Sequence, residues 1–95
     1  MEIVKERVRD DLQLKGWIVR EGTLYGADFV LYRPQEEFHE HSEYVVYVYT
    51  PQLTYEELLG SLRVSSIVKK VSASQKLVIA QETHGGFKYV QVTNN

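Results

Sequence analysis

The stretch YGADFVLYRPQEEFHEHSEYVVYVY, residues 25–49, decides the fold. Near its start, DFVLY (28–32) is mostly apolar and aromatic, which predicts a strand. At its end, SEYVVYVYT (42–50) is an almost continuous run of β-branched and aromatic residues, typical of a central strand covered on both faces. The intervening RPQEEFHEH (33–41) is polar, and Pro34 prevents the first strand from continuing. Two strands joined by a histidine-containing loop are therefore expected.

A helix and another strand are expected before this pair. Residues 2–15 carry an apolar residue at every fourth position, and Gly16 follows them where a helix commonly ends. The apolar positions are Val4, Val8 and Leu12. WIVRE (17–21) then predicts a strand, and GTLYGA (22–27) predicts the turn that joins it to DFVLY.

The rest of the chain predicts a second helix and two more strands. LTYEELLGSLRVSSIVKKV (53–71) begins with Thr54 and Glu57 in a capping-box pattern. The residues expected on one face of this helix are Leu58, Leu59, Leu62, Ser65 and Ser66. QKLVIAQ (75–81) and FKYVQVT (87–93) predict two strands, joined by the glycine-containing hairpin loop ETHGG.

The order of the elements predicts an α/β fold, in which a mixed β-sheet is flanked by two helices. The chain has no internal repeat or linker-like tract, so residues 1–95 are expected to form a single domain. It also has no run of about eighteen apolar residues that would span a membrane, and its charged amino terminus does not resemble a signal peptide. Cysteine is absent, which fits an intracellular protein.

The charge of the chain limits how it could bind RNA. The formal net charge is −2, so a generally basic nucleic-acid-binding surface is excluded. RNA binding would need a local basic patch. One candidate patch contains Arg63, Lys69 and Lys70, and the other contains Lys5, Arg7 and Arg9.

Three side chains are candidates for acid–base chemistry, and each has an ordinary alternative. Tyr32 ends a predicted strand and is either a proton acceptor assisted by a nearby cation or a tyrosine at the sheet edge. His41 is either a general acid or a solvated loop histidine, and neighbouring carboxylates would favour its protonated form. Lys70 either holds a phosphate or simply complements the dipole at a helix end.

Metal-dependent chemistry is less well supported by the sequence. His39 and His41 form an H-x-H pair, but zinc would need a third protein ligand, and the remaining candidates lack tight spacing. A restriction-type metal nuclease needs an acid-x-lysine pair after its first acid. Asp28 is followed by Glu43-Tyr44-Val45, without that lysine. No metal or cofactor is therefore expected.

A tyrosine base, a histidine acid and a lysine cation suit metal-free RNA cleavage. The base would remove the proton of a ribose 2′-hydroxyl, and the acid would protonate the departing 5′-oxygen. The cation would stabilise the charge on the phosphorane oxygens. The products would be a 2′,3′-cyclic phosphate and a 5′-hydroxyl.

Three motifs in order resemble the catalytic domain of the tRNA-splicing endonuclease family. They are GWIVREGTLYGADFVLYR (16–33), HSEYVVYV (41–48) and LLGSLRVSSIVKK (58–70), and the resemblance extends from about Leu12 to Val92. It implies a nuclease-like, restriction-endonuclease-like domain that cleaves precursor tRNA at exon–intron boundaries. The expected substrate is a bulge-helix-bulge-like RNA.

The resemblance also implies roles for individual residues. Tyr32 would be the proton acceptor and His41 the acid. Arg63 would clamp an unpaired nucleotide base of the RNA. Lys69, which belongs to the same basic patch, is also expected to contact the RNA. An ungapped match through the helix puts the family lysine at Lys70. A gapped match instead puts it at Gln75 with Lys76 beside it, because VSASQ separates Lys70 from the next strand. Lys70 is the expected catalytic lysine, because the helix matches without gaps from Leu58 onward.

The resemblance leaves the assembly open. Two cuts imply two active sites, so a homodimer or a hetero-oligomer with other endonuclease subunits is expected, with FKYVQV as a pairing edge. The hairpin loop ETHGG has one acid, Glu82, where family members often carry an acidic docking loop. Homotetrameric members have an additional N-terminal domain, so the chain is expected to be a small subunit or an isolated catalytic domain. The alternative function is a non-catalytic structural subunit. The expected location is the cytoplasm in an archaeon or the nucleus in a eukaryote.

Overall fold

A computed structural model describes residues 2–49 and 62–92 of the chain. The described helices are α1 (Glu2–Leu14) and α3 (Leu62–Lys70), with short 3-10 turns at Thr23–Tyr25 and Pro34–Glu36. The strands are β1 (Ile18–Glu21), β2 (Phe29–Tyr32), β3 (Tyr44–Val48), β4 (Lys76–Thr83) and β5 (Gly86–Val92). The described helices are too short to cross a membrane.

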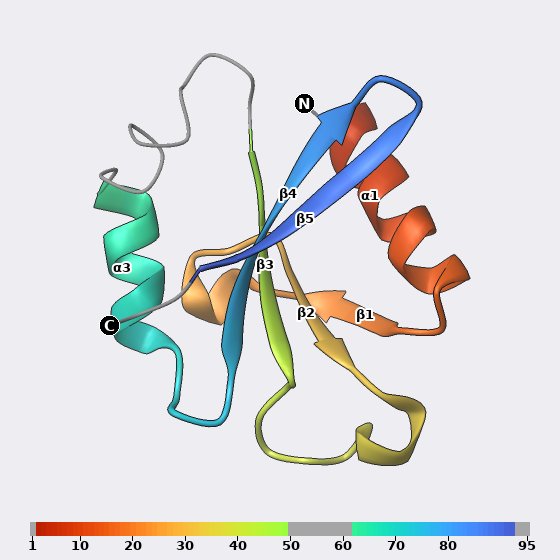
Figure 1. The fold of residues 1–95 in the computed structure, drawn as a ribbon. Helices are drawn as coiled ribbons and strands as arrows, with labels where there is room; N and C mark the ends of the chain where they lie inside the picture. The colour runs from red at the N-terminus through yellow and green to blue at the C-terminus, as the bar shows by residue number, and fades with distance from the viewer. Residues whose placement is uncertain (1, 50–61, 93–95) are drawn as a thin grey trace.

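The strands form one mixed sheet in the order β1-β2-β3-β4-β5. All neighbouring strands are antiparallel except β3 and β4, which run parallel. The chain passes through α3 between these two parallel strands, as a crossover connection requires. The predicted α/β fold with a mixed sheet and two helices is confirmed (Figure 1).

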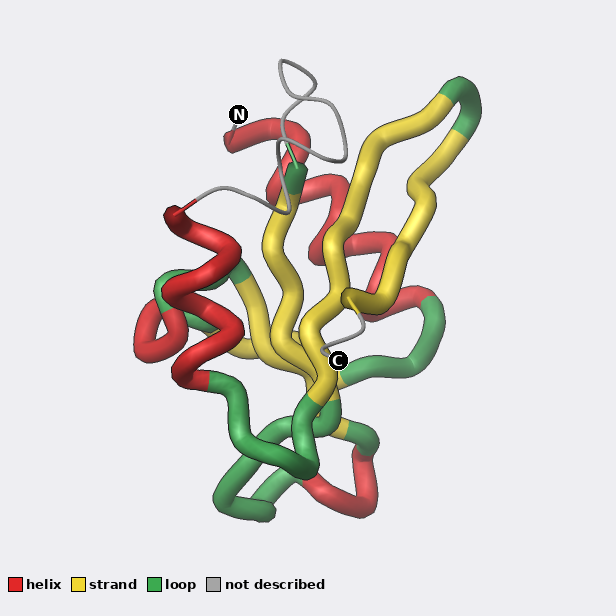
Figure 2. Tube along the Cα trace, turned by 60° about the vertical axis from the view of Figure 1, so that its left-hand side comes forward, coloured by secondary structure: helices red, strands yellow, loops and turns green. Residues whose placement is uncertain are grey.

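The two helices cover opposite faces of the sheet (Figures 1 and 2). On the α1 side, Val8 and Leu12 pack in one core cluster with Val46 of β3. On the α3 side, Val64 and Ile67 pack in a second cluster with Val45 of β3. Because adjacent strand residues point to opposite faces, β3 supplies both cores, as its continuous apolar sequence predicted.

The predicted apolar face of the second helix was wrong where the structure describes it. Leu62 is 89% exposed, and Ser65 and Ser66 are also exposed. The helix instead buries Val64 and Ile67, which lie three positions apart. Burying valine and isoleucine removes more apolar surface from water than burying serine, so this face packs on the sheet. The predicted capping box of Thr54 and Glu57, like Leu58 and Leu59, lies outside the described residues.

The turn before β2 depends on a glycine and an aspartate. Gly26 has a φ of 74°, a left-handed conformation that side chains rarely adopt, and its N–H donates to the carbonyl of Thr23. Asp28 then joins three elements. Its Oδ2 accepts a 2.6 Å hydrogen bond from the backbone N–H of Val48, and its Oδ1 lies 2.9 Å from Nζ of Lys5.

We expect Asp28→Ala to destabilise the protein by about 1–3 kcal/mol, because the Val48 N–H would lose its acceptor in a partly buried site. Glu21→Ala is a matched control, since it also removes an ion pair between α1 and the sheet, but Glu21 is 70% exposed. The control should cost no more than about 1 kcal/mol. Urea unfolding of the two variants measures both values. Equal losses would contradict the role assigned to Asp28.

Candidate active site

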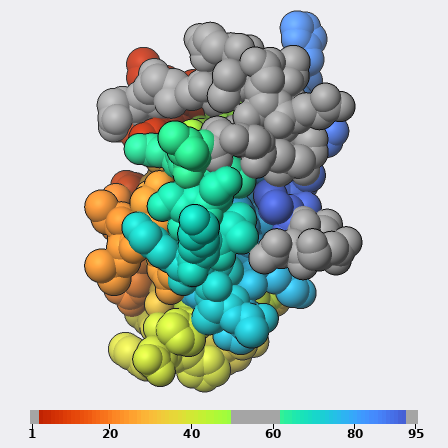
Figure 3. Space-filling model, turned by 90° about the vertical axis from the view of Figure 1, so that its left-hand side faces the viewer, coloured from red at the N-terminus to blue at the C-terminus, as the bar shows by residue number. Residues whose placement is uncertain are grey.

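A pocket of about 360 Å³ lies at the end of the sheet where β3 and β4 begin. Two separate loops form it, one before β3 and one before β4. The residues that line it are Glu36, His39, His41, Ser42, Glu43, Ser74 and Lys76. Figure 3 shows these two parts of the chain close together at the lower end of the molecule. The residues that line the pocket thus carry two imidazoles, one ammonium group, two hydroxyls and two carboxylates.

The parallel pairing of β3 and β4 brings the two loops together. Tyr44 is the register partner of Lys76, and the N–H of Lys76 donates to the carbonyl of Glu43. Parallel neighbours start at the same edge of a sheet. Consequently, the residues just before β3, including His41, lie beside those just before β4.

Glu43 is held at the pocket by Arg33. The guanidinium donates from Nε to Oε1 at 2.8 Å and from Nη2 to Oε2 at 3.1 Å. It also lies 4.7 Å from the centre of the Trp17 ring, which limits its orientation. Hydrogen bonding to Arg33 lowers the pKa of the Glu43 carboxyl below its usual value, so Glu43 is a fixed negative charge at neutral pH.

This ion pair predicts a pH dependence of stability. The pKa of Glu43 is lower in the folded protein than the usual glutamate value of 4.5, so the ionised carboxylate stabilises the folded state above about pH 4.5. This stabilisation is lost as the pH falls through the pKa that Glu43 has in the folded protein. Asp11, whose pKa is lowered by hydrogen bonds from Lys15 and Tyr89, acts in the same direction. Glu43→Gln should therefore lose less unfolding free energy than the wild type on acidification.

Urea titrations between neutral pH and about pH 2 measure this slope. Arg33→Met removes the same interaction from the other side and should flatten the acid limb in the same way. A Glu43→Gln protein that keeps the wild-type slope would show that this pair does not contribute.

The amide of Gln75 connects the loops around the pocket. Its Nε2 donates to Oη of Tyr25 at 2.9 Å and to Oγ of Ser42 at 3.0 Å, while its Oε1 accepts from the N–H of Ser72 at 3.0 Å. Gln75 is 6% exposed and Ser42 is 3% exposed. A neutral, buried amide is therefore hydrogen-bonded to Ser42, one of the residues that line the pocket.

Tyr32 lies at the end of β2, where the sequence predicted it. It is half-buried and packs against the core cluster on the α3 side of the sheet. It is not among the residues that line the pocket of His41. Its role as the base stays a prediction.

The basic residues of α3 lie apart from the pocket lining. Lys69 and Lys70 are exposed in the last turn of the helix, and neither lines the pocket of His41. The guanidinium of Arg63 lies 5.8 Å from the centre of the Tyr47 ring. Within residues 2–49 and 62–92, none of these three cations forms an ion pair. Their predicted roles in catalysis and RNA binding stay predictions.

The second candidate basic patch is neutralised by acidic residues. Lys5 pairs with Asp28, Arg7 with Glu82, and Arg9 with Glu21. These pairs offset the charge that an RNA phosphate would need, so α3 is the better candidate surface. Arg7 thus pairs with the one acid of the predicted ETHGG loop, but the structure places Glu82 within β4.

Sequence patterns alone did not assign Lys76, Ser42 or Ser74 to the site. The gapped family match is the signal that pointed to Gln75 and Lys76, and the structure places both beside the His41 loop. In the part of the chain that the structure describes, no three His, Asp or Glu side chains are grouped as metal ligands would be.

Comparison with known proteins agrees with the resemblance seen in the motifs. Residues 3–86 match the family described as tRNA intron endonuclease, catalytic C-terminal domain. The chain belongs to the tRNA intron endonuclease family. The matched segment contains both loops of the pocket.

Curated relatives from several archaea carry the name tRNA-splicing endonuclease. The Methanococcus vannielii protein is 37% identical over 79 residues, covering 81% of this chain and 42% of the relative. The Saccharolobus solfataricus protein is 39% identical over 88 residues, covering 88% of this chain and 45% of the relative. The Thermoplasma volcanium protein is 31% identical over 90 residues, covering 95% and 28%. The chain spans less than half the length of these members of the tRNA intron endonuclease family.

Proposed function

We propose that this domain is an endoribonuclease that cleaves precursor tRNA at exon–intron boundaries. The observation that carries the proposal is the grouping of His41 and Lys76 in one pocket, within the segment that matches the tRNA intron endonuclease family. An imidazole on the loop before β3 and an ammonium group at the start of β4 would supply a proton donor and a cation to one bound phosphate. We further propose that the nuclease-like fold of residues 1–95 is a single domain of the restriction-endonuclease-like type.

The proposed reaction is a metal-independent transesterification. Tyr32 accepts the proton of the ribose 2′-hydroxyl, and the 2′-oxygen forms a bond to phosphorus. The bond from phosphorus to the 5′-oxygen breaks, and His41 gives its proton to that oxygen. The products are a 2′,3′-cyclic phosphate and a 5′-hydroxyl, so the proposed enzyme is an RNA lyase.

The cation of this site is proposed to be Lys76. Lys76 lines the pocket with His41, whereas Lys70 does not. An ammonium group here would stabilise the negative charge that builds on the phosphorane oxygens. Under this proposal Lys69, Lys70 and Arg63 bind the RNA along α3, since α3 has basic residues in its last turn and no acidic residue.

We propose an assembly of two or more such domains. Precursor tRNA has two cut sites, and each needs an active site. β5 is at the edge of the sheet, and among the residues that the structure describes no strand pairs with its outer side. We propose that this edge pairs with another copy or with a related subunit.

A second candidate is a non-catalytic structural subunit of the same enzyme. The observation that favours it is Gln75, a neutral and buried residue where the gapped match places the family lysine. Such a subunit would position the RNA and a catalytic partner without itself transferring protons.

The test is incubation of the chain with an intron-containing precursor tRNA, with the same tRNA lacking the intron as the matched control. Two cuts in the precursor and none in the control are expected. Cleavage that needs a partner subunit, and survives His41→Ala in this chain, would establish the structural subunit instead.

A further inference from the structure

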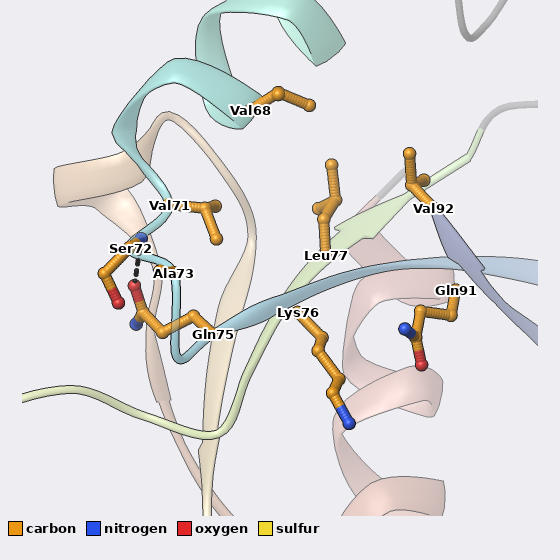
Figure 4. A pocket seen from close by; sticks show the side chains of 9 residues that line it. All are labelled: Val68, Val71, Ser72, Ala73, Gln75, Lys76, Leu77, Gln91 and Val92. Atoms are coloured by element: carbon orange, nitrogen blue, oxygen red, sulfur yellow. Dashed lines mark hydrogen bonds between the residues drawn. The ribbon is translucent and has the colours of Figure 1, made fainter. Parts of the chain in front are cut away.

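The side-chain amide of Gln75 forms hydrogen bonds through both its nitrogen and its oxygen, and these bonds join three segments of the chain. The three hydrogen bonds reach the turn at Tyr25, the loop at Ser42 and the end of the α3 connection at Ser72. The backbone N–H of Gln75 also donates to the carbonyl of Ser72, which closes that turn from both sides. Figure 4 shows the Gln75 side chain folded back toward Ser72, whereas that of Lys76 extends away from it.

These hydrogen bonds lie next to the residues of the proposed chemistry. Ser42 directly follows His41, and its hydroxyl donates in turn to the carbonyl of Tyr44 at 3.0 Å. Lys76 directly follows Gln75. The amide therefore ties the loop of His41 to the start of β4, where Lys76 lies, and both segments line the pocket.

Burial makes this connection specific. A buried amide that satisfies both its donor hydrogens and its acceptor holds its partners in one arrangement, because any slippage leaves polar groups without partners. His41 itself is exposed, so its own contacts do not restrain it in this way. Its position depends on the backbone that Ser42 anchors.

We propose that Gln75 is a positioning residue, which sets the place of His41 relative to Lys76 through Ser42. The expected effect of Gln75 on catalysis rests on the proposed function, whereas its expected effect on the position of His41 does not. Gln75 is then more than a residue that replaces the family lysine. Its neutral amide holds the two loops in place, and Lys76 supplies the positive charge.

The test is Gln75→Met, which keeps the length of the side chain and removes all its hydrogen bonds. The matched control is Gln13→Met, the same change at an exposed position on α1. The chain has three histidines, so three imidazole Cε1–Hε1 cross-peaks are expected in a carbon–proton NMR spectrum. Gln75→Met should move the His41 cross-peak and leave that of His84, in the β4–β5 turn, in place. Gln13→Met should move none.

The kinetic readout separates positioning from general stability. Measured below its unfolding temperature, Gln75→Met should lower kcat by about tenfold to a hundredfold, with a KM for RNA that stays within about twofold of the wild type. An unchanged His41 cross-peak in the folded variant, or a wild-type kcat, would overturn the proposal. If the wild-type assembly purified through this chain cuts no RNA, the proposed function fails, but the cross-peak still decides whether Gln75 positions His41.

Tyr25→Phe provides a second variant in case Gln75→Met does not fold. It removes one acceptor of the Gln75 amide at a partly buried site and keeps the aromatic ring. A smaller movement of the His41 cross-peak in the same direction is expected. A cross-peak identical to that of the wild type would overturn the proposal.

Discussion

His41→Ala should lower kcat for precursor tRNA cleavage by about 10²–10⁴-fold, the range expected for loss of a general acid. The 5′-oxygen would have to leave without a proton, and no lining residue other than His39 offers a second imidazole. KM should change little, because the imidazole acts on the leaving group rather than on the bound RNA as a whole. Single-turnover cleavage assays measure the rate of the chemical step directly.

Two histidine variants control for this result. His39→Ala changes the same residue type in the same pocket and should have a much smaller effect, whereas His84→Ala in the β4–β5 turn should have none. If His41→Ala retains activity and His39→Ala loses it, the acid is His39 and the assignment from the family motif fails.

Lys76→Met should lower kcat by about 10²–10³-fold, the loss seen when a donor to a developing oxyanion is removed. Lys76 lines the pocket of His41, so we expect its charge to act where the phosphorane forms. Lys70→Met is the matched variant at the end of α3. Its expected effect is a higher KM and a weaker salt dependence, with kcat largely kept, since an exposed lysine contributes to phosphate binding.

The opposite outcome is equally informative. A large loss of kcat in Lys70→Met, together with a near-normal Lys76→Met, would make the helix-end lysine the cation, as the ungapped match indicates. The pocket would then have to rearrange around bound RNA for Lys70 to reach it.

The fold was largely predictable because its strongest signals are local. The β-branched and aromatic run at 44–48 requires apolar surroundings on both faces, and β3 packs against both helices. The four-residue spacing of Val4, Val8 and Leu12 likewise identified the face of α1 that packs on the sheet. The face of α3 was mispredicted because Leu62 was grouped with Ser65 and Ser66, whereas the helix buries Val64 and Ile67.

The site was less predictable because it depends on a long-range pairing. Nothing near Lys76 in the sequence shows that it lies beside His41. That proximity arises from the parallel register of β3 and β4, set only when α3 crosses between them. The sequence predicts Gln75 only as the first residue of a strand, and its burial follows from partners that lie 33 and 50 residues away along the chain.

The measurement that tests the central claim most directly is end-group analysis of precursor tRNA cut in EDTA. The enzyme should be the assembly purified through a tag on this chain, in parallel with the same assembly carrying His41→Ala. We predict 2′,3′-cyclic phosphate and 5′-hydroxyl ends at the exon–intron boundaries for the wild type, and uncut RNA for His41→Ala. Ends that carry a 5′-phosphate and a 3′-hydroxyl, or cleavage that begins only when a divalent cation is added, would contradict the account.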